Sequence, residues 1–308
     1  MIKKNVLIVG CGALGCSLAA MLSSVAAITV YDRGERTRRI IRRRGIFLKE
    51  GRKAFHARAE VVDHPRELSG RLFDLIIITT KVAGVRAAAE LTARYARAKN
   101  VFFPQNGIFD LSWATDLFRS ADISRGVATI ACREAGAGRV EIAFRGKVFA
   151  GGAGARKIAA LFARAGVRSA AVADPRRAVW AKLIFNAVMN PLPVITGRGY
   201  DILKEDAAVY GLARRAILEG KRLAAAEGVR LAFDPMRAVD GIRLGRYGVI
   251  RHMGSTYTDV MSGRPTEMCF MTGALLEIAR RHRIAVPALT GISSAFADKT
   301  DIKIRRGF

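Results

Sequence analysis

The stretch VLIVGCGALG, residues 6–15, decides the class of fold. Its first four residues are aliphatic and mostly β-branched, which is typical of a strand buried on both faces of a parallel sheet. Its last six contain a G-x-G-x-x-G pattern, a helix is predicted at 17–23, and a second apolar strand at 27–31. Strand, glycine turn, helix and strand over about 30 residues form one βαβ unit.

Each glycine of this pattern has its own physical task. Gly10 permits a tight turn, Gly12 lets the backbone approach a pyrophosphate, and Gly15 allows the helix to pack closely. The helix N-terminus then offers free N–H groups and the positive end of its dipole to phosphate oxygens. We therefore predict a dinucleotide site formed by Gly10, Cys11, Gly12, Ala13, Leu14 and Gly15.

The end of the second strand bears on which dinucleotide is bound. Asp32 lies 20 residues after Gly12, where an acid binds the ribose 2′-hydroxyl of NAD. Arg33 comes next, where a guanidinium could bind the 2′-phosphate of NADP. The carboxylate of Asp32 would repel that phosphate unless it turns away. Because Arg36 and Arg38 follow closely in the sequence, we favour NADP(H) as the cofactor. Asp32 leaves NAD(H) as the alternative.

Beyond this unit the pattern predicts an α/β fold in two domains. The first half alternates short apolar strands with helical stretches, and the second half contains long helical patterns punctuated by proline. We expect a Rossmann-type, doubly wound dinucleotide-binding domain over 1–172 and an all-helical domain over 173–308 for substrate binding and dimerisation. The predicted strands are 59–62, 74–80, 101–103, 126–132, 139–144 and 148–152, and the predicted helices are 82–98, 177–190, 207–227, 235–246 and 267–282.

Length and composition agree with two globular domains. The chain has 308 residues, of which 51% are hydrophobic and 25% charged, and this excludes a disordered or fibrous protein. We expect no membrane span, because no uninterrupted apolar run approaches about 18–20 residues. The N-terminal apolar run breaks at Gly10, so we expect no signal peptide and a cytoplasmic protein. The four cysteines and four histidines are scattered, and we predict no metal site.

The chain is strongly basic. Lys and Arg number 52 against 26 Asp and Glu, which gives a net charge of +26. Such an excess favours anionic partners: nucleotides, carboxylates, phosphates or nucleic acid. Seven arginines fall within residues 33–44, but nucleic-acid sites interleave aromatic residues with charge, and only 7% of this chain is aromatic. We therefore interpret the arginine-rich segment first as a solvated surface. A site for a cofactor phosphate is the second interpretation, and a nucleic-acid site is the last.

Polar residues follow two of the predicted strands. Thr80 and Lys81 end a buried strand, and Gln105, Asn106 and Gly107 follow the next one. Ligands of open α/β sheets collect at the carboxyl ends of the strands, where both groups would lie.

A second polar pattern lies in the helical half. Lys182, Asn186 and Asn190 are spaced i, i+4, i+8 on an otherwise apolar helix, so one amine and two amides share a face. Buried polar groups cost free energy unless they are paired, and this stripe therefore calls for a polar partner or ligand.

At this point the sequence resembles the ketopantoate reductase (2-dehydropantoate 2-reductase) family over nearly its whole length. The resemblance rests on the glycine motif at 10–15, the strand-terminal Lys81, the pair Asn106-Gly107 and the polar helix at 182–192. It continues through Ser255 to Asp259 and through the motif Gly263-Arg264-Pro265-Thr266-Glu267.

This resemblance implies a reaction and a set of roles. A hydride passes from NADPH to the C2 ketone of ketopantoate and gives pantoate, which leads to pantothenate and coenzyme A. Lys182 matches the general acid that protonates the ketone oxygen, and Glu267 matches its orienting carboxylate. The residues that match substrate-pocket positions are Asn106, Asn186, Asn190 and Ser255. Lys81 and Asn106 match positions near the nicotinamide. Thr80, from its place at the end of the strand, is predicted to bind the cofactor with them and with the glycine loop.

The motif around Glu267 departs from the family pattern. Met268-Cys269 stands where an aliphatic residue and an acid are usual, and Thr272 stands where an amide is common. These changes leave open a relative that reduces another 2-keto acid. Two further alternatives remain: a dehydrogenase of 3-hydroxy acids or opines with the same architecture, and a Rossmann redox sensor that binds nucleic acid. The apolar faces of the helical half permit a homodimer.

Overall fold

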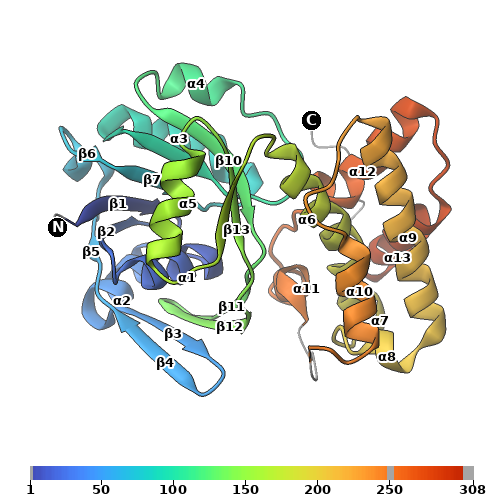
Figure 1. Ribbon diagram of the computed structural model, residues 1–308. Coiled ribbons are helices and arrows are strands. Elements are labelled where there is room, and N and C mark those ends of the chain that lie inside the picture. Colours follow the sequence, from blue (N-terminus) through green and yellow to red (C-terminus); the bar gives the residue numbers. More distant parts are fainter. Residues whose placement is uncertain (1–2, 248–252, 301–308) are drawn as a thin grey trace. The chain divides into compact units, whose positions relative to one another are not determined.

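The computed structural model describes residues 3–247 and 253–300, which form two compact units (Figure 1). The first unit comprises the chain up to Gln105 together with 110–175, and the second comprises 106–109 and the chain from Arg176 onward. The division near 175 lies three residues after the boundary predicted from the sequence. The short segment 106–109, which groups with the helical unit, was not anticipated.

The first unit is built on an eight-stranded sheet whose order is β14-β13-β10-β9-β7-β1-β2-β5. Neighbouring strands run parallel except β13 and β10, which are antiparallel. The central strands are almost wholly buried and aliphatic, as the apolar runs predict. Their bounds are β1 Lys4–Val9, β2 Ala26–Tyr31, β5 Glu60–Val61, β7 Leu75–Ile78, β9 Asn100–Phe103, β10 Asp122–Ala128, β13 Val148–Gly152 and β14 Ser169–Val172.

Helices cover both faces of this sheet. The ring of Phe102 packs edge-on against Phe162 of α5, whereas its neighbour Phe103 packs against Trp113 of α4. Successive strand residues point to opposite faces, so α5 and α4 lie on different sides and the sheet is doubly wound. The helices of this unit are α1 Ala13–Leu22, α2 Glu35–Arg44, α3 Val82–Tyr95, α4 Trp113–Leu117 and α5 Ala155–Arg164, with a 3₁₀ turn η1 at Pro65–Leu68.

A second, four-stranded sheet packs against α1 and has the order β11-β12-β3-β4. Its inner face buries Ile46, Leu48, Val140 and Ile142 in the same core as α1. The predicted strand 126–132 was wrong, because this range contains the end of β10 and the start of β11 with a break between them. The bounds are β3 Ile46–Glu50, β4 Lys53–Ala57, β11 Ala131–Gly136 and β12 Arg139–Phe144, and a two-stranded pair joins β6 Leu72–Phe73 to β8 Arg97–Ala98.

The second unit is helical and is organised around α6, ten of whose 14 residues are buried. Glu219 of α9 accepts hydrogen bonds from the N–H groups of Ala288 (2.9 Å) and Leu289 (2.8 Å), and so caps the start of α13. The predicted helix 267–282 is interrupted at Met271, which separates η2 from α12. The elements are α6 Arg176–Met189, α7 Leu192–Thr196, α8 Ile202–Glu205, α9 Ala207–Ala226, α10 Pro235–Arg243, α11 Gly254–Met261, η2 Met268–Phe270, α12 Thr272–His282 and α13 Pro287–Thr300.

Among the described residues, one helical stretch is long and apolar enough to cross a membrane by length and composition alone, namely 176–196. Its apolar residues are interrupted by Lys182, Asn186 and Asn190, so the sequence shows no uninterrupted apolar run there. Of the 18 most apolar consecutive residues in this stretch, 78% are buried inside the protein, which is typical of a core helix.

Candidate active site

The glycine loop joins β1 to α1. Gly10 has a φ of +98° and its N–H donates to the Tyr31 carbonyl (2.8 Å). A Cβ on Gly15 would lie 1.9 Å from the Gly10 carbonyl oxygen, so no larger residue fits there. A Cβ on Gly12, by contrast, would meet no atom within 4 Å. Gly12 is exposed and no side chain caps α1, so the loop offers an open face at a helix N-terminus, where anions bind.

Asp32 is turned toward the backbone of this loop. One carboxylate oxygen accepts from the Cys11 N–H (2.6 Å) and the other from the Gly34 N–H (2.8 Å). The guanidinium of Arg38 donates to the carbonyl oxygens of Asp32 and Arg33 (2.7 and 2.9 Å). The side chain of Arg33 is exposed and has no polar partner within the described part of the chain. Both carboxylate oxygens of Asp32 are thus engaged by backbone N–H groups, and the exposed Arg33 side chain remains available to a ligand.

The carboxyl end of β7 lies against the glycine loop. The Thr79 hydroxyl donates to the carbonyls of Val9 and Gly10 (3.0 and 2.6 Å), which fixes the loop to the strand. A Cβ on Gly10 would lie 3.1 Å from the Thr80 methyl group, so Thr80 borders the loop directly. Lys81 is exposed at the N-cap of α3.

Two polar groups at this edge of the sheet were not predicted as site residues. Gln105, 5% exposed, donates through Nε2 to the Ile78 carbonyl (2.5 Å) and the Thr80 carbonyl (3.2 Å). The side-chain oxygens of Gln105 and Thr80 are buried, and neither has a partner among the described residues. Arg125 pairs in register with Phe103, the last residue of β9, and burial lowers the pKa of its guanidinium to about 10.

Cys11 of the loop and Cys16 of α1 are both buried. The Cys16 thiol donates to the Cys11 carbonyl (3.0 Å). A hydrogen bond with Cys16, together with burial, raises the pKa of the Cys11 thiol well above its usual value. Because only the thiolate is a good nucleophile, Cys11 acts as a small apolar residue of the turn.

In the helical unit, the two amides of the predicted polar stripe lie in the core: Asn186 in α6 and Asn190 directly after it. Asn186 is 7% exposed and Asn190 6% exposed. Asn190 accepts from the Tyr200 hydroxyl (3.1 Å) and its amide nitrogen lies 3.8 Å from the Met271 sulfur. The Asn186 side chain has no hydrogen-bond partner within the described residues. Lys182 is partly buried one turn before Asn186.

The segment 106–109 brings Asn106 into the same unit. The Ile108 N–H donates to the Phe270 carbonyl (3.1 Å), and a Cβ on Gly107, whose φ is +86°, would lie 2.6 Å from that oxygen. This close approach requires glycine. Asn106 is thereby held beside η2, which begins directly after Glu267, and its buried side-chain oxygen has no partner among the described residues.

Helix α11 approaches Asn190 from another side. A Cβ on Gly254, the first residue of α11, would lie 3.0 Å from the Tyr200 hydroxyl and 3.8 Å from the Asn190 oxygen. Ser255, the next residue, is exposed, and Asp259 is buried and bonds Arg264 (3.1 Å). Backbone and side-chain contacts thus connect the neighbourhoods of Asn106, Asn190, Ser255 and Glu267.

Two of the residues that depart from the family pattern, Met268 and Thr272, are buried in the core of the helical unit. Met268 is 1% exposed and lies 3.9 Å from the Thr256 hydroxyl, so it fills the core behind Glu267. Thr272 is fully buried, and its hydroxyl donates to the Ala187 carbonyl (2.8 Å). In an uninterrupted helix residue 191 would donate to that carbonyl, but residue 191 is proline and has no N–H. Thr272 replaces the missing donor.

This replacement predicts a stability effect. Thr272→Val keeps the shape of the side chain but leaves the buried Ala187 carbonyl unpaired, so we expect a loss of about 1–3 kcal/mol in the free energy of unfolding. Thr272→Ser retains the hydroxyl and should lose less. Urea denaturation of the three proteins measures the difference, and a Val variant as stable as the parent would contradict the role of the hydroxyl.

Two family models match the chain, one mainly within each of the two units. Residues 6–154 match the family model "Ketopantoate reductase PanE/ApbA", and residues 174–300 match its C-terminal model. A 2-dehydropantoate 2-reductase of Mycobacterium tuberculosis is 28% identical over 92% of this chain and 93% of its own length. One of Halobacterium salinarum is 28% identical over 70% and 72%.

Solved structures show the same architecture. The PanE/ApbA family ketopantoate reductase from Ralstonia eutropha superposes with a TM-score of 0.81 at 26% identity, over 98% of this chain and all of that one. A D-mandelate dehydrogenase solved with NADH and anilino(oxo)acetate also superposes with a TM-score of 0.81, at 20% identity, over 96% and 98%. At that identity the second likeness shows the fold alone.

Proposed function

The chain belongs to the ketopantoate reductase family, and from this premise we propose that it reduces 2-dehydropantoate to pantoate with NADPH as the hydride donor. The observation that carries the proposal is the set of buried amide groups in the helical unit. Asn186 and the side-chain oxygen of Asn106 have no protein partner among the described residues. Buried amides without partners cost free energy, so they favour a ligand rich in oxygen atoms, such as a hydroxylated keto acid.

The first unit fits a dinucleotide on its own geometry. The open face at Gly12, the uncapped start of α1 and the unpaired oxygens of Thr80 and Gln105 provide donors and acceptors at the carboxyl edge of the sheet. When bound, the reduced nicotinamide supplies the hydride that adds to the C2 ketone. We assign the pyrophosphate to the loop 10–15, with Thr80 and Lys81 toward the nicotinamide.

The choice of NADPH over NADH rests on Asp32 and Arg33. Both oxygens of the Asp32 carboxylate accept hydrogen bonds from backbone N–H groups, those of Cys11 and Gly34. An acid that is held in this way hinders a 2′-phosphate less than one that projects into the ribose site. The Arg33 guanidinium then binds the 2′-phosphate of NADPH through charge-assisted hydrogen bonds.

The chemistry assigned to the helical unit is proton donation. As hydride reaches the ketone carbon, negative charge develops on the oxygen, and the Lys182 ammonium donates a proton to it, which yields the hydroxyl of pantoate. Glu267 orients this ammonium. Asn106, Asn186, Asn190 and Ser255 hold the carboxylate and hydroxyl of the substrate. Lys182 regains its proton from water after product release.

A steady-state assay tests the proposal. We expect oxidation of NADPH, followed at 340 nm, to require ketopantoate and to be slower with NADH. The same assay with other branched and aromatic 2-keto acids tests the alternative. In that alternative Met268 and Cys269, which differ from the family pattern, change which 2-keto acid the enzyme prefers. If a different 2-keto acid is reduced with a much higher kcat/KM than ketopantoate, that acid and not ketopantoate is the substrate. The proposed enzyme is cytoplasmic, and a homodimer is compatible with it.

Two glycine variants test the cofactor loop. Gly12→Ala places a methyl group in open space, at a φ of −74° that any residue adopts, so the fold should be unaffected. The methyl group should nevertheless keep the pyrophosphate from the backbone, and we expect NADPH affinity to fall at least tenfold with unchanged thermal stability. Gly15→Ala should lower stability as well, because its methyl group overlaps the Gly10 carbonyl. Unaltered NADPH binding by Gly12→Ala would contradict the assigned pyrophosphate site.

A further inference from the structure

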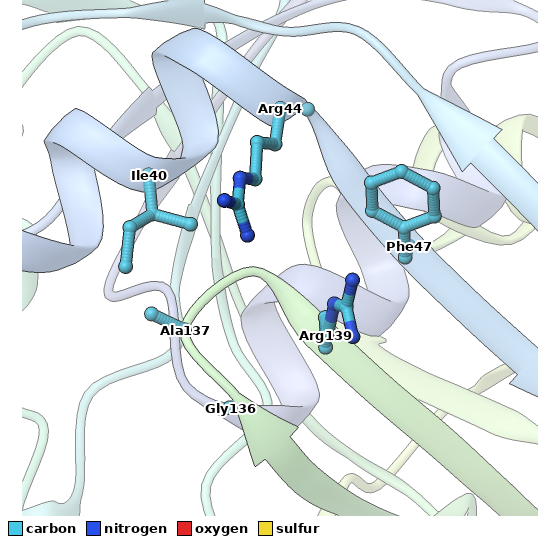
Figure 2. A pocket seen from close by; sticks show the side chains of 7 residues that line it. Ile40, Arg44, Phe47, Gly136, Ala137 and Arg139 are labelled. Atoms are coloured by element: carbon cyan, nitrogen blue, oxygen red, sulfur yellow. The ribbon is translucent and has the colours of Figure 1, made fainter.

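The first unit has a small basic pocket away from the glycine loop. It lies where the C-terminal end of α2, the start of β3 and the turn between β11 and β12 meet, and has a volume of about 220 Å³. Figure 2 shows the side chains that line it: Ile40, Arg44, Phe47, Gly136, Ala137 and Arg139. Arg33 lies before the N-terminus of helix α2, whereas the pocket is lined by Ile40 and Arg44 in the C-terminal half of this helix.

Two guanidinium groups extend into this pocket, those of Arg44 and Arg139 (Figure 2). Neither has a carboxylate or other hydrogen-bond acceptor within the part of the chain that the structure describes. On the same helix Arg38 and Arg42 share Asp63, at 3.5 and 2.7 Å, whereas the exposed Arg36, Arg39 and Arg43 lie outside the pocket. Two like charges that share a pocket repel each other, and a bound anion would remove that repulsion.

The walls of the pocket are fixed by local contacts. The His56 ring stacks on Phe47 with centroids 4.4 Å apart, and its Nε2 lies 2.6 Å from the Arg44 carbonyl oxygen. The guanidinium carbon of Arg139 lies over the same Phe47 ring, 5.6 Å from its centre. The Phe47 N–H donates to the Gly138 carbonyl (2.8 Å), which ties β3 to the turn. A ligand would therefore meet a preformed site and order little more than two side chains.

We propose that this pocket is a second anion site, which binds the phosphate group of a small phosphorylated ligand. Guanidinium groups match phosphate oxygens with paired hydrogen bonds, and two of them suit a doubly charged phosphate. The apolar side chains of Ile40 and Ala137 can contact the carbon atoms attached to it. The volume is below the roughly 300–1,000 Å³ of ordinary cofactor sites, so the pocket takes a phosphate with a few further atoms and not a whole dinucleotide.

Calorimetric titration with inorganic pyrophosphate in 0.15 M NaCl tests the site. We expect Arg44→Gln and Arg139→Gln each to weaken binding about tenfold. Arg43→Gln is the matched control, because it removes the same charge from the adjacent exposed position of α2, outside the pocket. It should change the dissociation constant less than twofold. Equal weakening by all three variants, or by none, would overturn the proposal.

A second measurement locates the bound anion, since the glycine loop could also take pyrophosphate. The side-chain NMR signals of His56 should shift during the titration, because His56 contacts both Phe47 and the Arg44 carbonyl. Binding that leaves these signals unmoved lies elsewhere and contradicts the pocket. The readout does not involve reductase activity, so it is independent of the proposed function.

A single-stranded DNA octamer separates a small ligand from nucleic acid. For the proposed site, the octamer should bind no more tightly than pyrophosphate in 0.15 M NaCl. Tighter binding of the octamer, weakened equally by Arg43→Gln and Arg44→Gln, would assign the arginines of α2 to a nucleic-acid surface and overturn the proposal.

Discussion

Lys182→Ala should lower kcat for ketopantoate reduction by about 10²- to 10⁴-fold, the usual contribution of a general acid. The dissociation constant for NADPH should stay within twofold of the parent, because the glycine loop and Arg33 belong to the other unit. Stopped-flow measurement of hydride transfer and fluorescence titration with NADPH separate these two effects.

The controls for this variant are a neutral replacement and a second lysine. Lys182→Met preserves the length and apolar stem of the side chain, so a similar loss of kcat would exclude a packing effect. Lys221 pairs with Asp234 (3.2 Å) on the surface of the helical unit, and Lys221→Met should leave kcat unchanged. Partial recovery of Lys182→Ala by added ethylamine would support proton donation. A kcat close to the parent in either Lys182 variant would refute the general-acid role.

Arg33→Gln should weaken NADPH binding about 10- to 100-fold and leave NADH binding within twofold. The magnitude corresponds to the loss of one or two charge-assisted hydrogen bonds, at about 1.5–3 kcal/mol. The variant should remain folded, since the Arg33 side chain is exposed and no polar group among the described residues depends on it.

Fragments of the cofactor sharpen this test. Binding of 2′,5′-ADP should fall as much as that of NADPH, whereas 5′-ADP should bind unchanged. Arg43→Gln, near the C-terminal end of the following helix α2, controls for the loss of one positive charge from the same region of the chain. If NADPH and NADH weaken equally, Arg33 does not recognise the 2′-phosphate.

The parts of the fold that the sequence predicted are those with strong local patterns. The β-branched run before Gly10 and the strand before Thr79 predicted the buried parallel strands, and the family models agree with the predicted fold. Residues 35–44 were not predicted as a helix, because Ile40 and Ile41 are the only large apolar side chains among many arginines. The helix forms because Ile41 is buried in the core of the first unit, a contact between distant parts of the chain.

The candidate site divides in the same way. The sequence by itself determined which polar and glycine residues are available for binding and catalysis, and how they are spaced locally. They are the three glycines, the amine and two amides at 182, 186 and 190, and the motif that ends in Glu267. These follow from short-range periodicity and from the φ values that only glycine adopts readily.

Only the tertiary structure decided where polar groups find their partners. The Asp32 carboxylate turns to the Cys11 N–H group 21 residues away, Gln105 bonds the end of β7, and Thr272 supplies the donor that Pro191 lacks. Each of these bonds joins residues far apart in the sequence. A buried polar atom pairs with whatever the packing brings within about 3 Å, and no local pattern records that distance.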